Sequence, residues 1–105
     1  MKNVVVLGAS DKPERMSHTA VVLLKEKGYR VIPVHPTLER LEDIEVVHSL
    51  SEVNVPVDVL SVYVNSDRSM AMKEEIMALR PQIVVFNPGS ESESLEEYLH
   101  EANIK

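Results

Sequence analysis

The chain opens on Val4-Val5-Val6-Leu7-Gly8-Ala9-Ser10, a short apolar run that ends in glycine and leads directly into an amphipathic stretch. This order of residues is typical of a buried strand, a tight turn and a helix. At such a junction we expect free backbone N–H groups beside a helix N-terminus, and both attract phosphate. The segment therefore predicts an α/β fold with a nucleotide-type ligand at its first turn.

Four short apolar runs, rich in β-branched residues, recur at residues 4–7, 31–34, 57–64 and 83–86. They are nearly continuous rather than alternating, as strands buried on both faces require. Helical patterns lie between them, so right-handed crossovers predict a three-layer, Rossmann-like, doubly wound parallel sheet. With these strands numbered along the chain, we expect the order 3-2-1-4, or 3-2-1-4-5 with a fifth strand, in one domain of residues 1–105.

Apolar spacing predicts three helices between and after these strands. The first covers residues 16–27 and stops at Gly28. The other two are marked by two apolar sets: Met72, Ile76 and Leu79, and then Leu95, Leu99 and Ala102. Residues 37–54 show no regular pattern apart from one helical turn at residues 50–53.

Composition and charge narrow the class of partner. The chain has 105 residues, a net charge of −6, no cysteine, three tyrosines and one phenylalanine. The acidic balance and the scarcity of rings for base stacking exclude nucleic acid as an expected partner, and disulfides and thiolate nucleophiles are impossible. The sequence shows no secretory leader pattern, and no apolar run approaches about 18 residues. We therefore expect a cytoplasmic protein with no membrane partner.

The loop after the first run carries groups suited to phosphate. Ser10 and Ser17 offer hydroxyls, Lys12 and Arg15 offer cations, and Gly8 allows close approach of the backbone. An alternative stays open, because any parallel sheet needs a small residue after its first strand and loop cations are often simply solvated.

The second loop bears on which nucleotide is bound. The dinucleotide fingerprint G-x-G-x-x-G is not met, because Ser10 and Pro13 stand where it has glycines. The second run ends in Val34-His35-Pro36, without the acidic residue that would hold the ribose of NAD. Arg40 lies within loop reach of His35 and would suit an extra phosphate on the ribose. NADP or coenzyme A therefore fits better than NAD.

No catalytic constellation is evident. None of the four histidines has another histidine three to five residues away, so a metal site is not expected. The acidic residues of the predicted loops, Asp11, Glu14 and Asp67, are typical of turns and helix starts. We expect a binding protein rather than an enzyme.

Three motifs together carry a resemblance to a known family: Gly8-Ala9-Ser10-x-x-Pro13-Glu14-Arg15, Gly28-Tyr29-Arg30-Val31-Ile32-Pro33-Val34-His35-Pro36, and Phe86-Asn87-Pro88-Gly89. With them the chain resembles, over nearly its whole length, the small stand-alone CoA-binding domains. These are similar to the CoA-binding domain of the succinyl-CoA synthetase α subunit.

The resemblance implies a site for coenzyme A or an acyl-CoA. In that family the first loop approaches the pyrophosphate, the turn after the second strand holds the adenosine, and the loop after the third strand contacts the pantetheine arm. The positions implicated here are Gly8, Ala9, Ser10, Lys12 and Arg15, then Val34, His35 and Pro36, then Tyr63, Val64, Asn65 and Ser66, with Asn87, Pro88 and Gly89 on the far side.

The chain departs from the family pattern at two places. The family commonly has asparagine where His35 stands, and relatives usually continue into a fifth strand beyond the position of Ile104 and Lys105. Without that strand, residues 83–86 would form an apolar sheet edge with unpaired N–H and C=O groups. We therefore expect a further strand or another subunit, in a homo-oligomer or a partner protein, to cover the edge.

These observations give a leading hypothesis and two alternatives. The chain is expected to bind coenzyme A or an acyl-CoA without catalysing a reaction of its own, since the phosphohistidine and ATP-grasp modules of the related synthetases are missing. One alternative is an NADP-dependent enzyme of the same fold. The other is a scaffold that acts through protein contacts alone.

Overall fold

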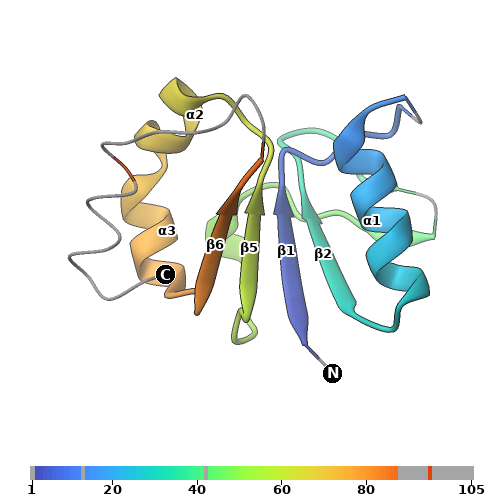
Figure 1. The fold of residues 1–105 in the computed structure, drawn as a ribbon. Coiled ribbons are helices and arrows are strands. Elements are labelled where there is room, and N and C mark those ends of the chain that lie inside the picture. Colours follow the sequence, from blue (N-terminus) through green and yellow to red (C-terminus); the bar gives the residue numbers. More distant parts are fainter. Residues whose placement is uncertain (1, 13, 42, 88–94, 96–105) are drawn as a thin grey trace.

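Four parallel strands form the centre of the structure, and helices lie on both sides of them (Figure 1). The computed structural model describes residues 2–12, 14–41, 43–87 and 95. The elements, in chain order, are β1 (Asn3–Leu7), α1 (Met16–Glu26), β2 (Arg30–Val34), β3 (Arg40–Leu41), β4 (Ile44–Glu45), the 3-10 turn η1 (Leu50–Glu52), β5 (Val59–Val62), α2 (Ser66–Ala71), α3 (Lys73–Leu79) and β6 (Ile83–Phe86).

The sheet has the order β2-β1-β5-β6, with every neighbouring pair parallel. The predicted Rossmann-like α/β class is confirmed, but the predicted strand order is wrong. The third predicted strand, β5, pairs with β1, where Val4 lies opposite Val59, and not with β2. The reason lies in the segment after β2, because Val47 forms a parallel bridge to Val34 and takes the place beside β2.

Proline is accommodated inside β2 because the backbone groups of residue 33 face Val47 and not β1. The backbone nitrogen of Val47 donates to the carbonyl oxygen of Pro33, and the nitrogen of His35 donates to the carbonyl oxygen of Val47, both at 3.0 Å. Residues 33 and 35 therefore turn their backbone groups away from β1. A missing N–H at Pro33 costs the β1–β2 ladder nothing, as expected for proline on an edge strand.

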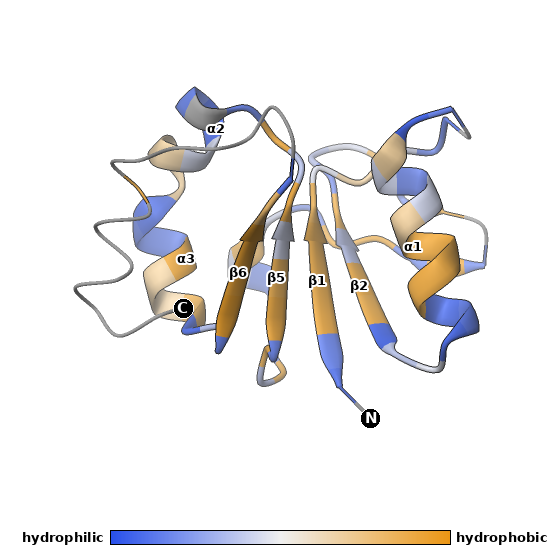
Figure 2. Ribbon diagram, in the orientation of Figure 1, coloured by the Kyte–Doolittle hydropathy of each residue, from blue (hydrophilic) through white to orange (hydrophobic). Residues whose placement is uncertain are grey.

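The two faces of the sheet bury two separate apolar clusters. Val5 and Leu7 point into a cluster with Ile76 of α3, whereas Val4 and Val6 point into a cluster with Val21 of α1. The strands are accordingly hydrophobic along most of their length, while the helices mix hydrophobic and hydrophilic residues (Figure 2). Burial on both sides explains why the strand sequences are continuous apolar runs.

Helix α1 and the turn η1 agree with the sequence prediction, whereas the helix predicted around Ile76 differs from it. Helix α1 ends within one residue of the predicted boundary, and the turn expected at residues 50–53 is η1. The helix marked by Met72, Ile76 and Leu79 is preceded by a separate helix, α2, and Met72 joins the two at φ −101° and ψ 12°. The helix expected around Leu99 and Ala102 lies outside the described residues.

Among the described residues, no helix combines the length and the apolar character needed to cross a bilayer. Residues 37–54, which lack a sequence pattern, contain the short β3–β4 hairpin and η1. Lys25 of α1 pairs with Asp43 between the two hairpin strands. The hydrogen bond from Lys25 holds the pKa of the Asp43 carboxyl below its ordinary value.

Arg80 ends α3 in the left-handed region, at φ 50° and ψ 55°, and its N–H donates to the carbonyl oxygens of Ile76 and Met77. We expect Arg80→Gly to stabilise the protein by about 0.5–1 kcal/mol, because glycine adopts this conformation without the steric penalty. Chemical denaturation measures the change. Lys27→Gly is the matched control, since Lys27 ends α1 at φ −83°, and it should destabilise; equal effects of the two changes would contradict the argument.

Gly8 turns the chain out of β1 at φ +90°, and a Cβ atom there would lie 2.9 Å from Cγ1 of Val64. We expect Gly8→Ala to lower the free energy of unfolding by about 2–4 kcal/mol, through backbone strain and the steric clash together. Gly28 has the same φ but open space around its Cβ position, so Gly28→Ala isolates the strain. A Gly8→Ala cost no greater than that of Gly28→Ala, by denaturant titration, would argue against the close contact.

Candidate functional site

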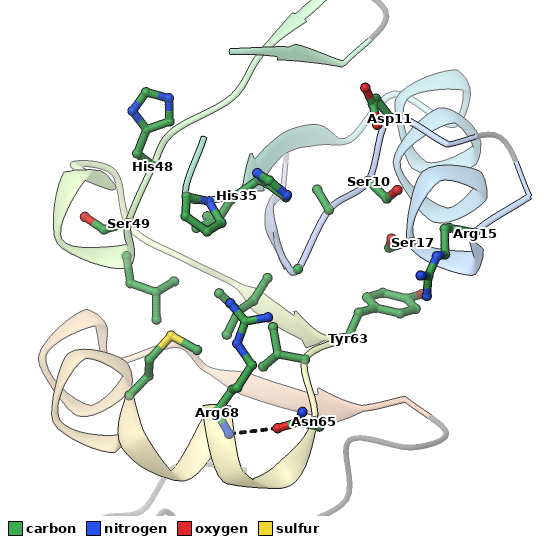
Figure 3. A pocket seen from close by; sticks show the side chains of 18 of the residues that line it. Ser10, Asp11, Arg15, Ser17, His35, His48, Ser49, Tyr63, Asn65 and Arg68 are labelled. Atoms are coloured by element: carbon green, nitrogen blue, oxygen red, sulfur yellow. Dashed lines mark hydrogen bonds between the residues drawn. The ribbon is translucent and has the colours of Figure 1, made fainter. Parts of the chain in front are cut away.

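A cavity of about 810 Å³ lies at the carboxyl ends of the central strands. Its walls come from the turn after β1, the turn after β2, the segment that leads into η1, and the connection from β5 to α2 (Figure 3). In open α/β sheets, ligands bind at this end of the strands, where the strand order reverses. Here the reversal falls between β1 and β5, so the cavity has the expected place.

The first turn is tied to the end of β2. The backbone nitrogens of Gly8 and Ala9 both donate to the carbonyl oxygen of Val34, each at 3.1 Å. The expectation of free N–H groups at the start of this turn is therefore wrong for these two residues. Further along the turn, the Ser10 hydroxyl accepts a hydrogen bond from the Lys12 nitrogen at 3.1 Å.

The N-terminus of α1 faces the cavity. Met16 and Ser17 line it, and Ser17 is only 5% exposed. Arg15 precedes the helix without a side-chain capping hydrogen bond, and no acidic residue stands in the first turn. The partial positive charge of the helix end is therefore not offset by an acid of its own first turn.

Positively charged side chains belong to two walls of the cavity. Lys12 and Arg15 belong to the loop before α1, and Arg68 belongs to α2. Figure 3 shows Arg15 and Tyr63 pointing toward one another on one side, while the Arg68 side chain extends into the space from another. Acidic residues also belong to the lining, Asp11 and Glu14 in the first loop and Glu75 in α3, so positive and negative groups share the walls.

The connection from β5 to α2 is held by Asn65. Its side-chain oxygen accepts a hydrogen bond from the backbone nitrogen of Arg68 at 2.9 Å and so caps α2. This is the usual role of asparagine before a helix. The cap fixes the start of α2 and with it the backbone position of Arg68.

His35 lines the cavity at the end of β2, between Val34 and Pro36. Its ring nitrogen Nδ1 accepts hydrogen bonds from the backbone nitrogens of Thr37 and Leu38, at 3.1 Å and 3.0 Å. The side chain therefore organises its own turn as well as facing the cavity.

Most residues expected in the site lie together at this cavity. Those that line it are Gly8, Ala9, Ser10, Lys12, Arg15, Ser17, Val34, His35, Pro36, Tyr63, Val64 and Asn65. Their contact with a ligand stays a prediction.

Other expected residues are not in the lining. Arg40 lies in β3 and donates from Nη2 to the carbonyl oxygen of Asp43 at 3.1 Å. Asn87 donates from Nδ2 to the Ser61 hydroxyl and to the Val62 carbonyl oxygen, both at 2.9 Å, so it joins the ends of β5 and β6. Ser66 is the first residue of α2. Pro88 and Gly89 lie outside the described residues.

Sequence reasoning missed part of the wall. Arg68 could have been expected in the site from the sequence, because it lies in the segment that follows the third predicted strand. His48 and Ser49 gave no such signal, because they come from the segment without a pattern, and the sequence predicts Leu50 only as part of a helical turn. All three follow the Val34–Val47 bridge, which brings them to the cavity. Leu7, Asp11, Glu14, Met16, Met72 and Glu75 complete the lining. Within the described ranges, no group of three His, Cys, Asp or Glu side chains could hold a metal ion.

One protein family and several known proteins are similar to this chain in sequence or structure. The model of the CoA binding domain family matches residues 2–105. The uncharacterized protein YneT of Bacillus subtilis (strain 168) is 34% identical over 76 residues, which are 72% of this chain and 56% of that protein. The chain thus spans little more than half the length of this relative.

Two solved structures illustrate the likeness of fold. A Thermus thermophilus protein, cell-free ID.343, has a TM-score of 0.93 and 38% identity, covering 98% of this chain and 78% of that one. A dinucleotide-forming acetyl-coenzyme A synthetase of Ca. Korarchaeum cryptofilum, in complex with phosphate and ADP, has a TM-score of 0.80 and 23% identity, covering 99% and 25%. From the match along residues 2–105 and the parallel sheet that carries it, the chain belongs to the CoA-binding domain family.

Proposed function

We propose that this chain binds coenzyme A or an acyl-CoA in the cavity, with the diphosphate between the first turn and the N-terminus of α1. The observation that carries the proposal is the helix end that faces the cavity without an acid in its first turn. Helix N-termini of this kind favour anions, and the neighbouring Lys12 and Arg15 add formal positive charge. Membership of the CoA-binding domain family supports the identity of the anion.

The hydrogen bonds of the first turn refine how the diphosphate would be held. Because Gly8 and Ala9 already donate to Val34, we assign the phosphate contacts to the helix N-terminus and the cationic side chains. Gly8 contributes differently, since the lack of a side chain lets the turn pack closely against Val64. Gly8 therefore shapes the floor of the site and does not donate a hydrogen bond to the ligand.

The size and lining of the cavity suit a ligand with a charged part and an uncharged arm. A volume of about 810 Å³ lies within the usual range for small-molecule sites, about 300–1,000 Å³. Leu50 of η1 and Met72, at the junction of α2 and α3, are apolar members of the lining outside the first loop. Arg68 extends into the cavity from α2 and would meet an anionic group of the ligand from a different wall than Arg15.

A panel of ligands tests the proposal. We expect CoA and acetyl-CoA to raise the melting temperature, since a ligand at about one hundred times its Kd adds roughly 2.7 kcal/mol to stability. NAD, NADP and ADP serve as comparisons in the same thermal-shift measurement. A response to NADP without one to CoA would favour an NADP-dependent enzyme, and no response to any member would favour a scaffold.

Two substitutions test the cationic walls. We expect Arg15→Ala and Arg68→Ala each to weaken CoA binding about five- to tenfold, through loss of charge-assisted hydrogen bonds to phosphate. Isothermal titration calorimetry gives the Kd values. Arg40→Ala is the control, because Arg40 lies outside the cavity lining, and its Kd should stay at the value of the unsubstituted protein. Equal losses in all three variants would point to general surface charge instead of a site.

A further inference from the structure

His35 is held at both its backbone and its ring. The backbone nitrogen donates to Val47 at 3.0 Å. The ring nitrogen Nδ1 accepts from the backbone nitrogens of Thr37 at 3.1 Å and Leu38 at 3.0 Å. The side chain is half-buried and faces the cavity, so its orientation is set before any ligand arrives.

These bonds determine where the proton of the imidazole lies. A backbone N–H can only donate, so Nδ1 must accept and cannot carry a proton. In a neutral imidazole the other nitrogen, Nε2, then has the proton and is a donor. Among the described residues, Nε2 makes no hydrogen bond. The cavity is therefore lined by an oriented N–H group that none of the described residues uses.

The position of this N–H relates it to the proposed phosphate site. His35 directly follows Val34, whose carbonyl oxygen holds the N–H groups of Gly8 and Ala9. The ring is thus anchored next to the first turn (Figure 3). The group closest to this turn in the proposed complex is the diphosphate, which offers acceptor oxygens only.

We propose that His35 is a specificity-determining residue whose Nε2–H donates a hydrogen bond to a phosphate oxygen of the bound nucleotide. This inference rests on the proposed function. The bond differs in kind from the contribution of Lys12 and Arg15, which attract any nearby anion. A donor with a fixed direction favours a ligand whose acceptor lies at one place, and the two hydrogen bonds to Nδ1 fix the direction of this ring.

One substitution separates the two functions of the ring. In His35→Asn the side-chain oxygen occupies about the place of Nδ1 and can accept from the same N–H groups, as asparagine does in Asx-turns. It offers nothing at the place of Nε2. His35→Ala removes both groups and serves as the comparison for loss of the turn.

We expect His35→Asn to keep the melting temperature of the unsubstituted protein, while its Kd for CoA and for ADP rises about tenfold, the usual cost of a lost hydrogen bond to a charged group. His35→Ala should lose both stability and affinity. Calorimetry and thermal denaturation give the two readouts. If His35→Asn binds CoA and ADP as tightly as the unsubstituted protein, the ring serves only the turn and the inference is overturned.

The protonation state can be measured without relying on affinity. Long-range ¹H–¹⁵N correlation spectra of the free protein should show Nδ1 unprotonated and Nε2 protonated, and CoA should shift the Nε2 resonance. A proton on Nδ1, or an unchanged Nε2 resonance in a protein saturated with CoA, would overturn the inference. Failure of the unsubstituted protein to bind either CoA or ADP would instead contradict the proposed function, so the two failures are distinguishable.

Discussion

The carbonyl oxygen of Val34 is the point on which the site depends. It accepts the N–H groups of both Gly8 and Ala9, so the turn after β1 and the end of β2 form one unit. These two hydrogen bonds set the direction in which the first loop leaves the sheet. The loop in turn brings Lys12, Arg15 and the start of α1 to the cavity. The donors most often credited with holding phosphate in such turns are used here to build the turn itself.

The Val47 bridge has a comparable effect on the opposite wall. By occupying the place beside β2, it leaves β5 to pair with β1, so β5 is the strand on the other side of the reversal at which the cavity opens. The same bridge carries His48 and Ser49 to the rim. A segment without a recognisable pattern thus determines both the order of the strands and part of the site.

The sequence predicted the parts of the structure that depend on local pattern. Continuous apolar runs gave the strands, and the spacing before Gly28 gave α1, because burial on two faces and helical periodicity leave direct traces in the order of residues. Strand order and the role of Asn87 could not be read in this way. Both depend on pairings between distant residues, Val34 with Val47 and Asn87 with Val62. The residue types at these positions do not indicate which partner each will have. The uses of His35 Nδ1 and of the Gly8 and Ala9 N–H groups were hidden for the same reason.

Pro33 and the exposed residues of β6 give the sheet two unlike borders. On the β2 side, Pro33 has no N–H to donate, and its carbonyl oxygen already accepts from the Val47 nitrogen, which discourages further pairing there. On the β6 side, Ile83 and Val85 are 45% and 42% exposed, and nothing in the described ranges pairs with the outer side of this strand. Extension of the sheet is therefore directional: the described residues favour an added strand, from this polypeptide or from another, beside β6 over one beside β2.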